Sequence, residues 1–209
     1  MGVLINKEWF EELSSAAPVP GGGGASAMSG AAAAALGMMV SNLTIGKKKY
    51  AAVENDVKAC QKRLEVLRDE MLDLIEADAK CFEPLAAAYS LPASTDDEKA
   101  AKEKIMAEAL VVACSVPLKT MEKGTEIADC LAELSEKGSV MAISDVAVGV
   151  EFVRTAVLGA SMNVYINTKT MKDRETAQKY NDYADRLNAE TSQKADAVFE
   201  KIKEALKCR

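Results

Sequence analysis

The amino-acid sequence predicts an all-α protein, a single-domain bundle of long helices over residues 1–209. Apolar residues recur with a spacing of three to four, whereas the alternating pattern of strands is nearly absent. Aromatic residues make up only 5% of the chain, and alanine and methionine are abundant, which suits closely packed helices. A chain of this length can bury a sizeable core without disulfides or metals.

Seven helices are expected, each recognised by apolar positions on one face and by residues that start or stop a helix. They cover residues 6–15, 25–44, 51–89, 95–121, 125–138, 144–167 and 173–206.

The boundaries follow local backbone rules. The first helix ends before Pro18, and Gly46 stops the second. Pro84 should kink the third helix or end it early, because proline removes a hydrogen bond and crowds the preceding turn. Thr95 or a neighbouring serine caps the fourth helix, with Glu98 as the partner of Thr95 in a capping box.

Two residues are expected to interrupt the apolar pattern that follows. Pro117 and Gly124 separate one helix from the next, which Gly138 ends. Ser144 then has the chemistry of an N-cap, and Asp145 in the first turn would favour the helix dipole.

Composition excludes several classes of protein. The formal net charge of −6 argues against a broad nucleic-acid footprint. The cysteines form no Cys-x-x-Cys pair, which indicates reduced thiols in a cytoplasmic protein; they are Cys60, Cys81, Cys114, Cys130 and Cys208. No secretory leader is visible, and the run over residues 24–45 is too rich in Ala, Gly and Ser to be expected in a membrane.

The chain contains no histidine, which constrains its chemistry further. A histidine base, a Ser-His-Asp triad and an imidazole metal ligand are all excluded. Proton transfer must fall to Asp, Glu, Lys, Cys, Tyr or water. A zinc site would need closely spaced cysteines, so we expect no metal.

The segment Pro18-Val19-Pro20-Gly21-Gly22-Gly23-Gly24 feeds directly into a helix of small residues. Glycines at a helix start expose backbone N–H groups, which bind an anion or the polar edge of a ring. The competing interpretation is a flexible linker after the first helix. Gly21, Gly22 and Gly23 are therefore candidate binding residues.

Two carboxylates are candidates for proton transfer. Asp78 lies on the apolar face of its helix, beside Leu74 and Phe82, where desolvation would raise its pKa. A solvated or ion-paired Asp78 at the edge of that face is the competing interpretation. Asp145 is the second candidate, although a helix-start charge explains it equally well.

Two asparagines lie on the same face of the 144–167 helix as Asp145, together with Phe152 and small residues. Buried amides need partners, which neighbouring helices or a flat heterocycle could supply. Asp145 and Asn163 would lie about 27 Å apart along a straight helix, and Asn167 farther still. If both ends of this helix line one site, a second protomer or an elongated ligand is required.

A basic cluster follows the small-residue helix: Lys47, Lys48 and Lys49. It is either a solvated helix end or a binding surface for an acidic group.

Several segments, in this order over nearly the whole chain, resemble the cyclodeaminase domain of formiminotransferase-cyclodeaminase and its stand-alone bacterial relatives. They are Pro20-Gly21-Gly22-Gly23, Leu43-Thr44-Ile45-Gly46-Lys47-Lys48-Lys49-Tyr50, Glu76-Ala77-Asp78-Ala79-Lys80-Cys81-Phe82, Ser115-Val116-Pro117-Leu118, Ser144-Asp145-Val146, and Gly159-Ala160-Ser161-Met162-Asn163-Val164-Tyr165-Ile166-Asn167. Two departures are visible: Gly24-Ala25 precede Ser26 where the family commonly reads Gly-Gly-Gly-Ser, and Glu76 stands where the family often has Asp.

The resemblance implies a folate one-carbon enzyme that acts as a homodimer, with no cofactor beyond its tetrahydrofolate substrate and no metal. The expected reaction is closure of 5-formiminotetrahydrofolate to 5,10-methenyltetrahydrofolate with release of ammonia. Hydrolysis of the methenyl group to 10-formyltetrahydrofolate is the alternative, and a non-catalytic folate-binding module is the third. Transfer of a formimino group is not expected from the residues present.

The resemblance also suggests roles for the candidate residues. Asp78, with Asp145 second, would shuttle the proton beside the cationic carbon. The glycine turn, Ser144, Asn163 and Asn167 would hold the folate. The lysines at 47, 48 and 49 would meet the glutamate carboxylates of a substrate that is often polyglutamylated.

Overall fold

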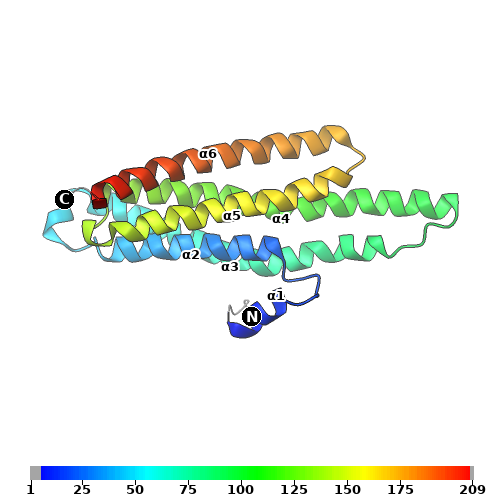
Figure 1. Cartoon of the computed structure of the whole chain (residues 1–209), viewed down its shortest axis with the longest axis horizontal. Helices are drawn as coiled ribbons and strands as arrows, with labels where there is room; N and C mark the ends of the chain where they lie inside the picture. The colour runs from blue at the N-terminus through cyan, green and yellow to red at the C-terminus, as the bar shows by residue number, and fades with distance from the viewer. Residues whose placement is uncertain (1–5, 208–209) are drawn as a thin grey trace.

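The computed structural model describes residues 6–207, and over this range the chain is helical with no strand (Figure 1). Six α-helices and two short 3₁₀ turns follow one another. They are α1 (Lys7–Leu13), α2 (Gly22–Asn42), η1 (Lys48–Tyr50), α3 (Glu54–Tyr89), α4 (Asp96–Lys137), η2 (Val140–Ala142), α5 (Ile143–Thr170) and α6 (Arg174–Lys207). The predicted all-α fold is confirmed.

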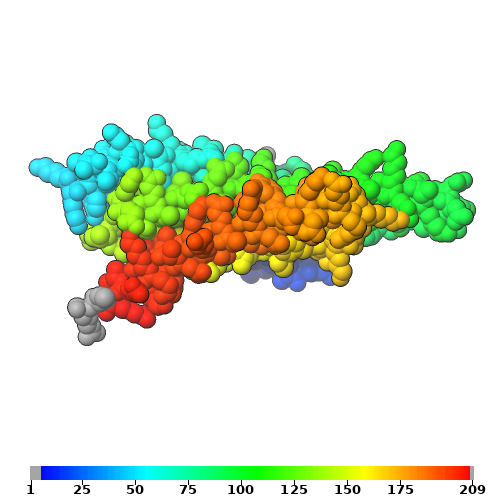
Figure 2. Space-filling model, turned by 90° about the horizontal axis from the view of Figure 1, so that it is seen from above, coloured from blue at the N-terminus to red at the C-terminus, as the bar shows by residue number. Residues whose placement is uncertain are grey.

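Helices α2 to α6 run up and down along one long axis, and α1 lies against the side of the bundle (Figure 1). The tips of α3 and α4 reach beyond the turn that joins α5 to α6, as both views show (Figures 1 and 2). We call the end where α2 begins and α5 finishes the glycine end. The opposite end, which carries η1 and η2, is the lysine end.

The sequence predicted one helix too many between α3 and α5. Helix α4 is continuous from Asp96 to Lys137 and contains both Pro117 and Gly124. At Gly124 a Cβ atom would lie 2.4 Å from Cγ2 of Val157 on α5. The glycine therefore permits close packing of two helices and does not interrupt α4.

The third helix reaches its predicted end at residue 89 and does not end early at Pro84, whereas the predicted cap at Ser144 was wrong. Pro84 lies inside α3, and the helix continues to Tyr89 because Leu85 and Ala88 beyond it are fully buried. Burying such side chains offsets the hydrogen bond that proline removes. Ser144 is not the N-cap of α5, since that helix begins at Ile143 directly after η2. By contrast, the capping box of Thr95 and Glu98 is confirmed.

Helix α2 packs against α3, α4 and α5. Its small residues make this close approach possible: a Cβ at Gly30 would meet Met71, and one at Gly37 would meet Leu64. By length and composition α2 could also cross a membrane, but 61% of its most apolar window is buried inside the bundle. A buried core helix of a bundle has the same composition.

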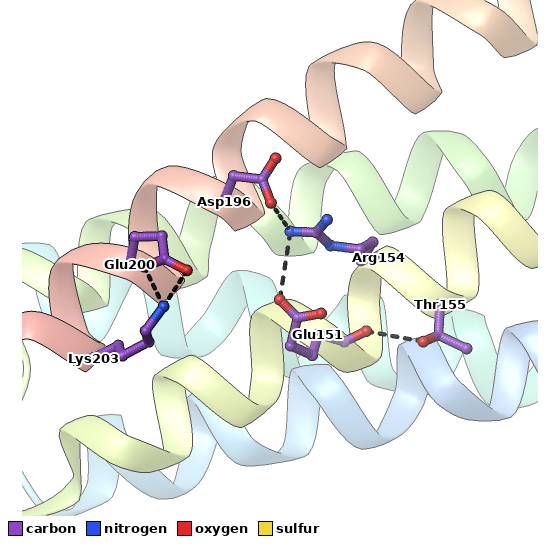
Figure 3. Close-up of polar contacts among 6 residues, drawn as sticks. All are labelled: Glu151, Arg154, Thr155, Asp196, Glu200 and Lys203. Atoms are coloured by element: carbon purple, nitrogen blue, oxygen red, sulfur yellow. Dashed lines mark hydrogen bonds and ion pairs between the residues drawn. The ribbon is translucent and has the colours of Figure 1, made fainter.

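Ion pairs hold α6 onto the outer flank of α5 (Figure 3). Arg154 bridges Glu151, at 3.4 Å, and Asp196 of α6. Thr155 turns the other way and donates to the carbonyl of Glu151 at 3.0 Å (Figure 3). The charges of α5 are thus concentrated near α6, which leaves a largely uncharged strip of the helix facing outward.

Candidate functional site

The site forms where Asp78 of α3 meets the first turn of α2. The backbone N–H of Gly24 donates to Oδ2 of Asp78 at 3.0 Å. This contact joins residues 54 positions apart in the sequence. A Cβ at Gly23 would lie only 2.1 Å from Oδ1 of Asp78, so the carboxylate fits here because residue 23 has no side chain. The glycine turn therefore leaves space for the carboxylate against the backbone of α2 and supplies a hydrogen bond to it.

Burial raises the pKa of Asp78 above its ordinary value, and the hydrogen bond from Gly24 opposes that shift. Desolvation is the larger of the two effects. No basic side chain is among the causes of this pKa shift. The interpretation of Asp78 as a half-buried carboxylate on an apolar face is confirmed, and the ion-paired alternative is not observed. A carboxylate with a raised pKa is a better proton acceptor near neutral pH.

Both predicted asparagines lie at this end of the bundle and are half-buried. Nδ2 of Asn163 donates to the carbonyl of Gly159 at 3.2 Å, and Nδ2 of Asn167 donates to the carbonyl of Ala113 at 3.1 Å. Asn163 also faces Gly22, since a Cβ there would lie 3.7 Å from its Nδ2. The backbone contacts fix both amides, so each Oδ1 is available to a ligand in a set orientation.

These residues surround one cavity of about 180 Å³. Its walls come from the segment before α2 and from α2, α3, α4 and α5. The lining residues are Pro18, Val19, Gly21, Gly22, Asp78, Cys81, Phe82, Ala113, Pro117, Asn163, Ile166 and Asn167. Segments that are distant in the sequence thus meet at the glycine end, as the resemblance required.

Cys81 also lines this cavity, one turn beyond Asp78. Burial, together with the negative charge of Asp78, raises the pKa of its thiol to about 11. At neutral pH Cys81 is therefore a neutral thiol and a poor nucleophile. Asp78 is the group in this cavity that is best placed to move a proton.

The remaining predicted residues lie at the lysine end. Lys47, Lys48 and Lys49 are exposed just after α2, and a 21-residue helix separates them from the cavity by about 30 Å. Ser144 and Asp145 begin α5 at the same end. The N–H of Val140, in η2, donates to the hydroxyl of Tyr50, in η1, at 3.1 Å, which ties these two segments together. One chain alone does not bring these residues to Asp78.

Several lining residues were missed by the sequence reasoning. Pro117 was treated as a helix breaker, although it forms part of the cavity wall. Ala113 and Ile166 carry no chemical signal of their own. Their spacing could have identified them, since Ile166 lies three residues after Asn163 on the same face of α5.

Within residues 6–207, no group of three or more cysteine and carboxylate side chains is placed to hold a metal ion.

Comparison with known proteins agrees with this geometry. Residues 6–186 match the profile of the formiminotransferase-cyclodeaminase family. The chain belongs to this family. The matched range includes every residue of the cavity.

Its relatives include proteins of two names. The chain is 40% identical over 195 residues to methenyltetrahydrofolate cyclohydrolase of Methylorubrum extorquens, covering 93% of this chain and 94% of that protein. It is 28% identical to formimidoyltransferase-cyclodeaminase of Rattus norvegicus, covering 80% of this chain but only 31% of the rat protein. The crystal structure of formiminotetrahydrofolate cyclodeaminase from Thermotoga maritima has a TM-score of 0.86 and 27% identity, covering 97% of this chain and 98% of that one.

Proposed function

We propose that the protein is a methenyltetrahydrofolate cyclohydrolase, which adds water to 5,10-methenyltetrahydrofolate and yields 10-formyltetrahydrofolate. The half-buried carboxylate of Asp78 in the cavity carries this proposal. It is supported by the relative of that name, which matches along almost the whole of both chains. This reverses the order that the sequence alone suggested, in which closure with loss of ammonia came first.

The proposed mechanism uses Asp78 as a proton shuttle. The substrate carries a positive charge over N5, the bridging carbon and N10, and a nearby carboxylate stabilises that charge. Asp78 accepts a proton as the oxygen of water bonds to the bridging carbon. The bond from that carbon to N5 then breaks, Asp78 returns its proton to N5, and the hydroxyl proton leaves to solvent. The formyl group remains on N10, and one proton is released overall.

The cavity walls supply orientation in this mechanism. The backbone of Gly21 and Gly22, which lines the cavity, allows a flat ring to approach closely because no side chain projects from it, whereas Gly23 leaves room for Asp78. The fixed amides of Asn163 and Asn167 would accept hydrogen bonds from the pterin ring. We propose no cofactor and no metal beyond the tetrahydrofolate substrate.

The second candidate is formiminotetrahydrofolate cyclodeaminase, supported by the similarity of the fold to the Thermotoga maritima enzyme. Here N10 attacks the amidine carbon, and Asp78 carries the N10 proton to the departing ammonia. The same carboxylate serves either reaction, so the attacking group distinguishes them. A folate-binding module without activity is the third candidate.

An absorbance assay separates these candidates, since methenyltetrahydrofolate has its own near-ultraviolet band. The purified protein is given 5,10-methenyltetrahydrofolate in one cuvette and 5-formiminotetrahydrofolate in another. Accelerated loss of the band in the first supports the proposal. Appearance of the band in the second, with no acceleration in the first, overturns it in favour of the cyclodeaminase. No catalysis in either leaves the binding module.

We also propose that two copies of the chain pair through the outward strip of α5. This strip carries partly exposed apolar side chains, whereas monomers rarely expose large apolar surfaces; they are Val148, Phe152, Leu158, Met162 and Ile166. Thr155 lies midway between Val148 and Met162 in the sequence. Two antiparallel copies crossing at Thr155 would therefore place Val148 opposite Met162 and Phe152 opposite Leu158.

Such a pairing would also unite the two groups of predicted residues. The partner's Ser144 would come opposite Ile166, which lines the cavity, with the partner's Asp145 one residue farther along the helix. The partner's lysines 47, 48 and 49 lie at the same end and would approach the cavity too. The homodimer thereby gives these residues a place in substrate binding that a single chain does not. We expect the assembly to act in the cytoplasm, free of nucleic acid and membrane.

A further inference from the structure

A second cavity, of about 260 Å³, lies where the α3–α4 turn meets the α5–α6 turn. Its floor is formed by apolar side chains of α4, namely Met106, Ala107 and Leu110. Three lysines, Lys99, Lys102 and Lys172, stand around it. An apolar floor with a cationic rim suits a ligand that is hydrophobic at one end and acidic at the other.

This cavity is the neighbour of the one at Asp78. Leu110 precedes Ala113 by three residues on α4, and Thr170 follows Asn167 by three on α5. Each pair lies on one face of its helix, one turn apart, which is about 5 Å along the axis. Both cavities therefore lie between α4 and α5, and Asn167, bonded to the carbonyl of Ala113, marks the boundary between them.

The lysines of the rim have different partners. Lys102 donates to the carbonyls of Tyr89 and Leu91, both at 2.8 Å, so its charge is held in place by neutral groups. Lys172 pairs with Glu103 at 2.5 Å, and this carboxylate is the one acidic side chain in the cavity wall. Lys99 pairs with Asp96 at 2.9 Å, so two of the three lysines have a competing carboxylate. The three lysines and these two carboxylates still leave a net positive charge.

We propose that this second cavity binds the acidic glutamate tail of the folate, an inference that rests on the proposed function. A cavity of 180 Å³ around Asp78 has room for a bicyclic ring but not for a whole folate. The benzoyl group then passes over the boundary at Asn167, and the glutamate carboxylates reach the lysines. Within one chain, the other lysine cluster lies about 30 Å from Gly22 and is out of reach, so it could meet the tail only from a partner subunit, which the variants at 47 and 48 below test.

The test compares substrates with one and with three γ-linked glutamates. The double variant Lys99→Gln/Lys172→Gln removes two rim charges and leaves Lys102 to support the α3–α4 turn. Lys62→Gln/Lys104→Gln is the matched control, because both lysines are exposed and neither lines the cavity. Exposed charge pairs change affinity modestly, so we expect KM for the three-glutamate substrate to rise about three- to tenfold in the first variant, with kcat unchanged. The control should not change.

Removing a negative charge from the cavity wall should have the opposite effect on KM. Glu103→Gln removes the carboxylate that competes for Lys172 and should lower KM for the three-glutamate substrate. Both effects should weaken as salt is added. Equal KM values for wild type and all variants would overturn the proposal. So would a KM rise confined to Lys47→Gln/Lys48→Gln, since the tail would then lie at the lysine end.

A binding experiment separates failure of this inference from failure of the proposed reaction. Calorimetry with 5-formyltetrahydrofolate carrying one or three glutamates needs no turnover. Tighter binding of the three-glutamate form, lost in Lys99→Gln/Lys172→Gln, supports the tail site even if neither reaction is catalysed. No preference for the longer tail, or no binding of either form, overturns it.

Discussion

Replacing Gly23 with alanine should inactivate the protein while leaving it folded. The new Cβ would lie 2.1 Å from Oδ1, 2.4 Å from Cγ and 2.5 Å from Oδ2 of Asp78, whereas ordinary contacts begin near 3.4 Å. Asp78 must therefore move by about 1 Å or more, and its hydrogen bond from Gly24 is strained or lost. Misplacement of a catalytic group by about 1 Å costs on the order of 10²-fold in rate.

The effect on stability should be much smaller. Alanine is favoured over glycine in a helix by up to about 1 kcal/mol, whereas a hydrogen bond to a charged group contributes about 1.5–3 kcal/mol. The net loss of about 0.5–2 kcal/mol would lower Tm by roughly 2–8 °C in a chain of this size. The variant thus remains folded at 25 °C.

Gly22→Ala is the matched control on the neighbouring residue. Its Cβ would lie 3.7 Å from Nδ2 of Asn163, which is an ordinary contact. Turnover should therefore stay within about threefold of wild type. The assay is the absorbance of methenyltetrahydrofolate, with Tm measured on the same samples. Full activity in Gly23→Ala, or an equal loss in Gly22→Ala, would refute the idea that Gly23 positions Asp78 by leaving space for its carboxylate.

Four further outcomes are expected. Asp78→Asn should lower turnover by on the order of 10²-fold with little change in Tm, because the amide oxygen still accepts from Gly24; a larger loss in Asp145→Asn would transfer the catalytic role to Asp145. The acidic limb of kcat/KM should lie above the ordinary carboxyl pKa of about 4, since burial raises the pKa of Asp78 and its ionised form is the active one; an unchanged limb in residual Asp78→Asn activity would contradict this. Turnover should survive exhaustive chelation, and loss on EDTA restored by one divalent ion would show a metal site. Light scattering should give the mass of a dimer, and Met162→Glu should shift it toward the monomer; a wild-type monomer would refute the pairing.

Local rules predicted most of the fold. The apolar spacing identified the helices, and the Thr95 capping box was found from residue chemistry alone. The errors at Pro117 and Gly124 share one cause, because both residues are unfavourable in an isolated helix. In the bundle, packing against neighbouring helices outweighs that preference, and packing is not visible in a local window.

The candidate site was predictable as a set of residues but not as an arrangement. Asp78 and Asn163 were identified from their positions on apolar faces, and the structure brings them to one cavity. The seating of Asp78 against Gly23 depends on a contact between α2 and α3, which no spacing along one helix reveals. The sequence did indicate that Asp145 and Asn163 were too far apart for one small ligand, because helix length follows directly from residue number.

The packing of α2 against α5 bears on how the chain is made. This helix has no charged residue between Gly22 and Asn42, and its partner α5 is synthesised only after both α3 and α4. At ordinary rates of translation the ribosome needs roughly 5–20 s to add that intervening stretch. During that interval one flank of α2 has no partner within the nascent chain, so the earliest folding intermediate presents an apolar surface to cellular chaperones.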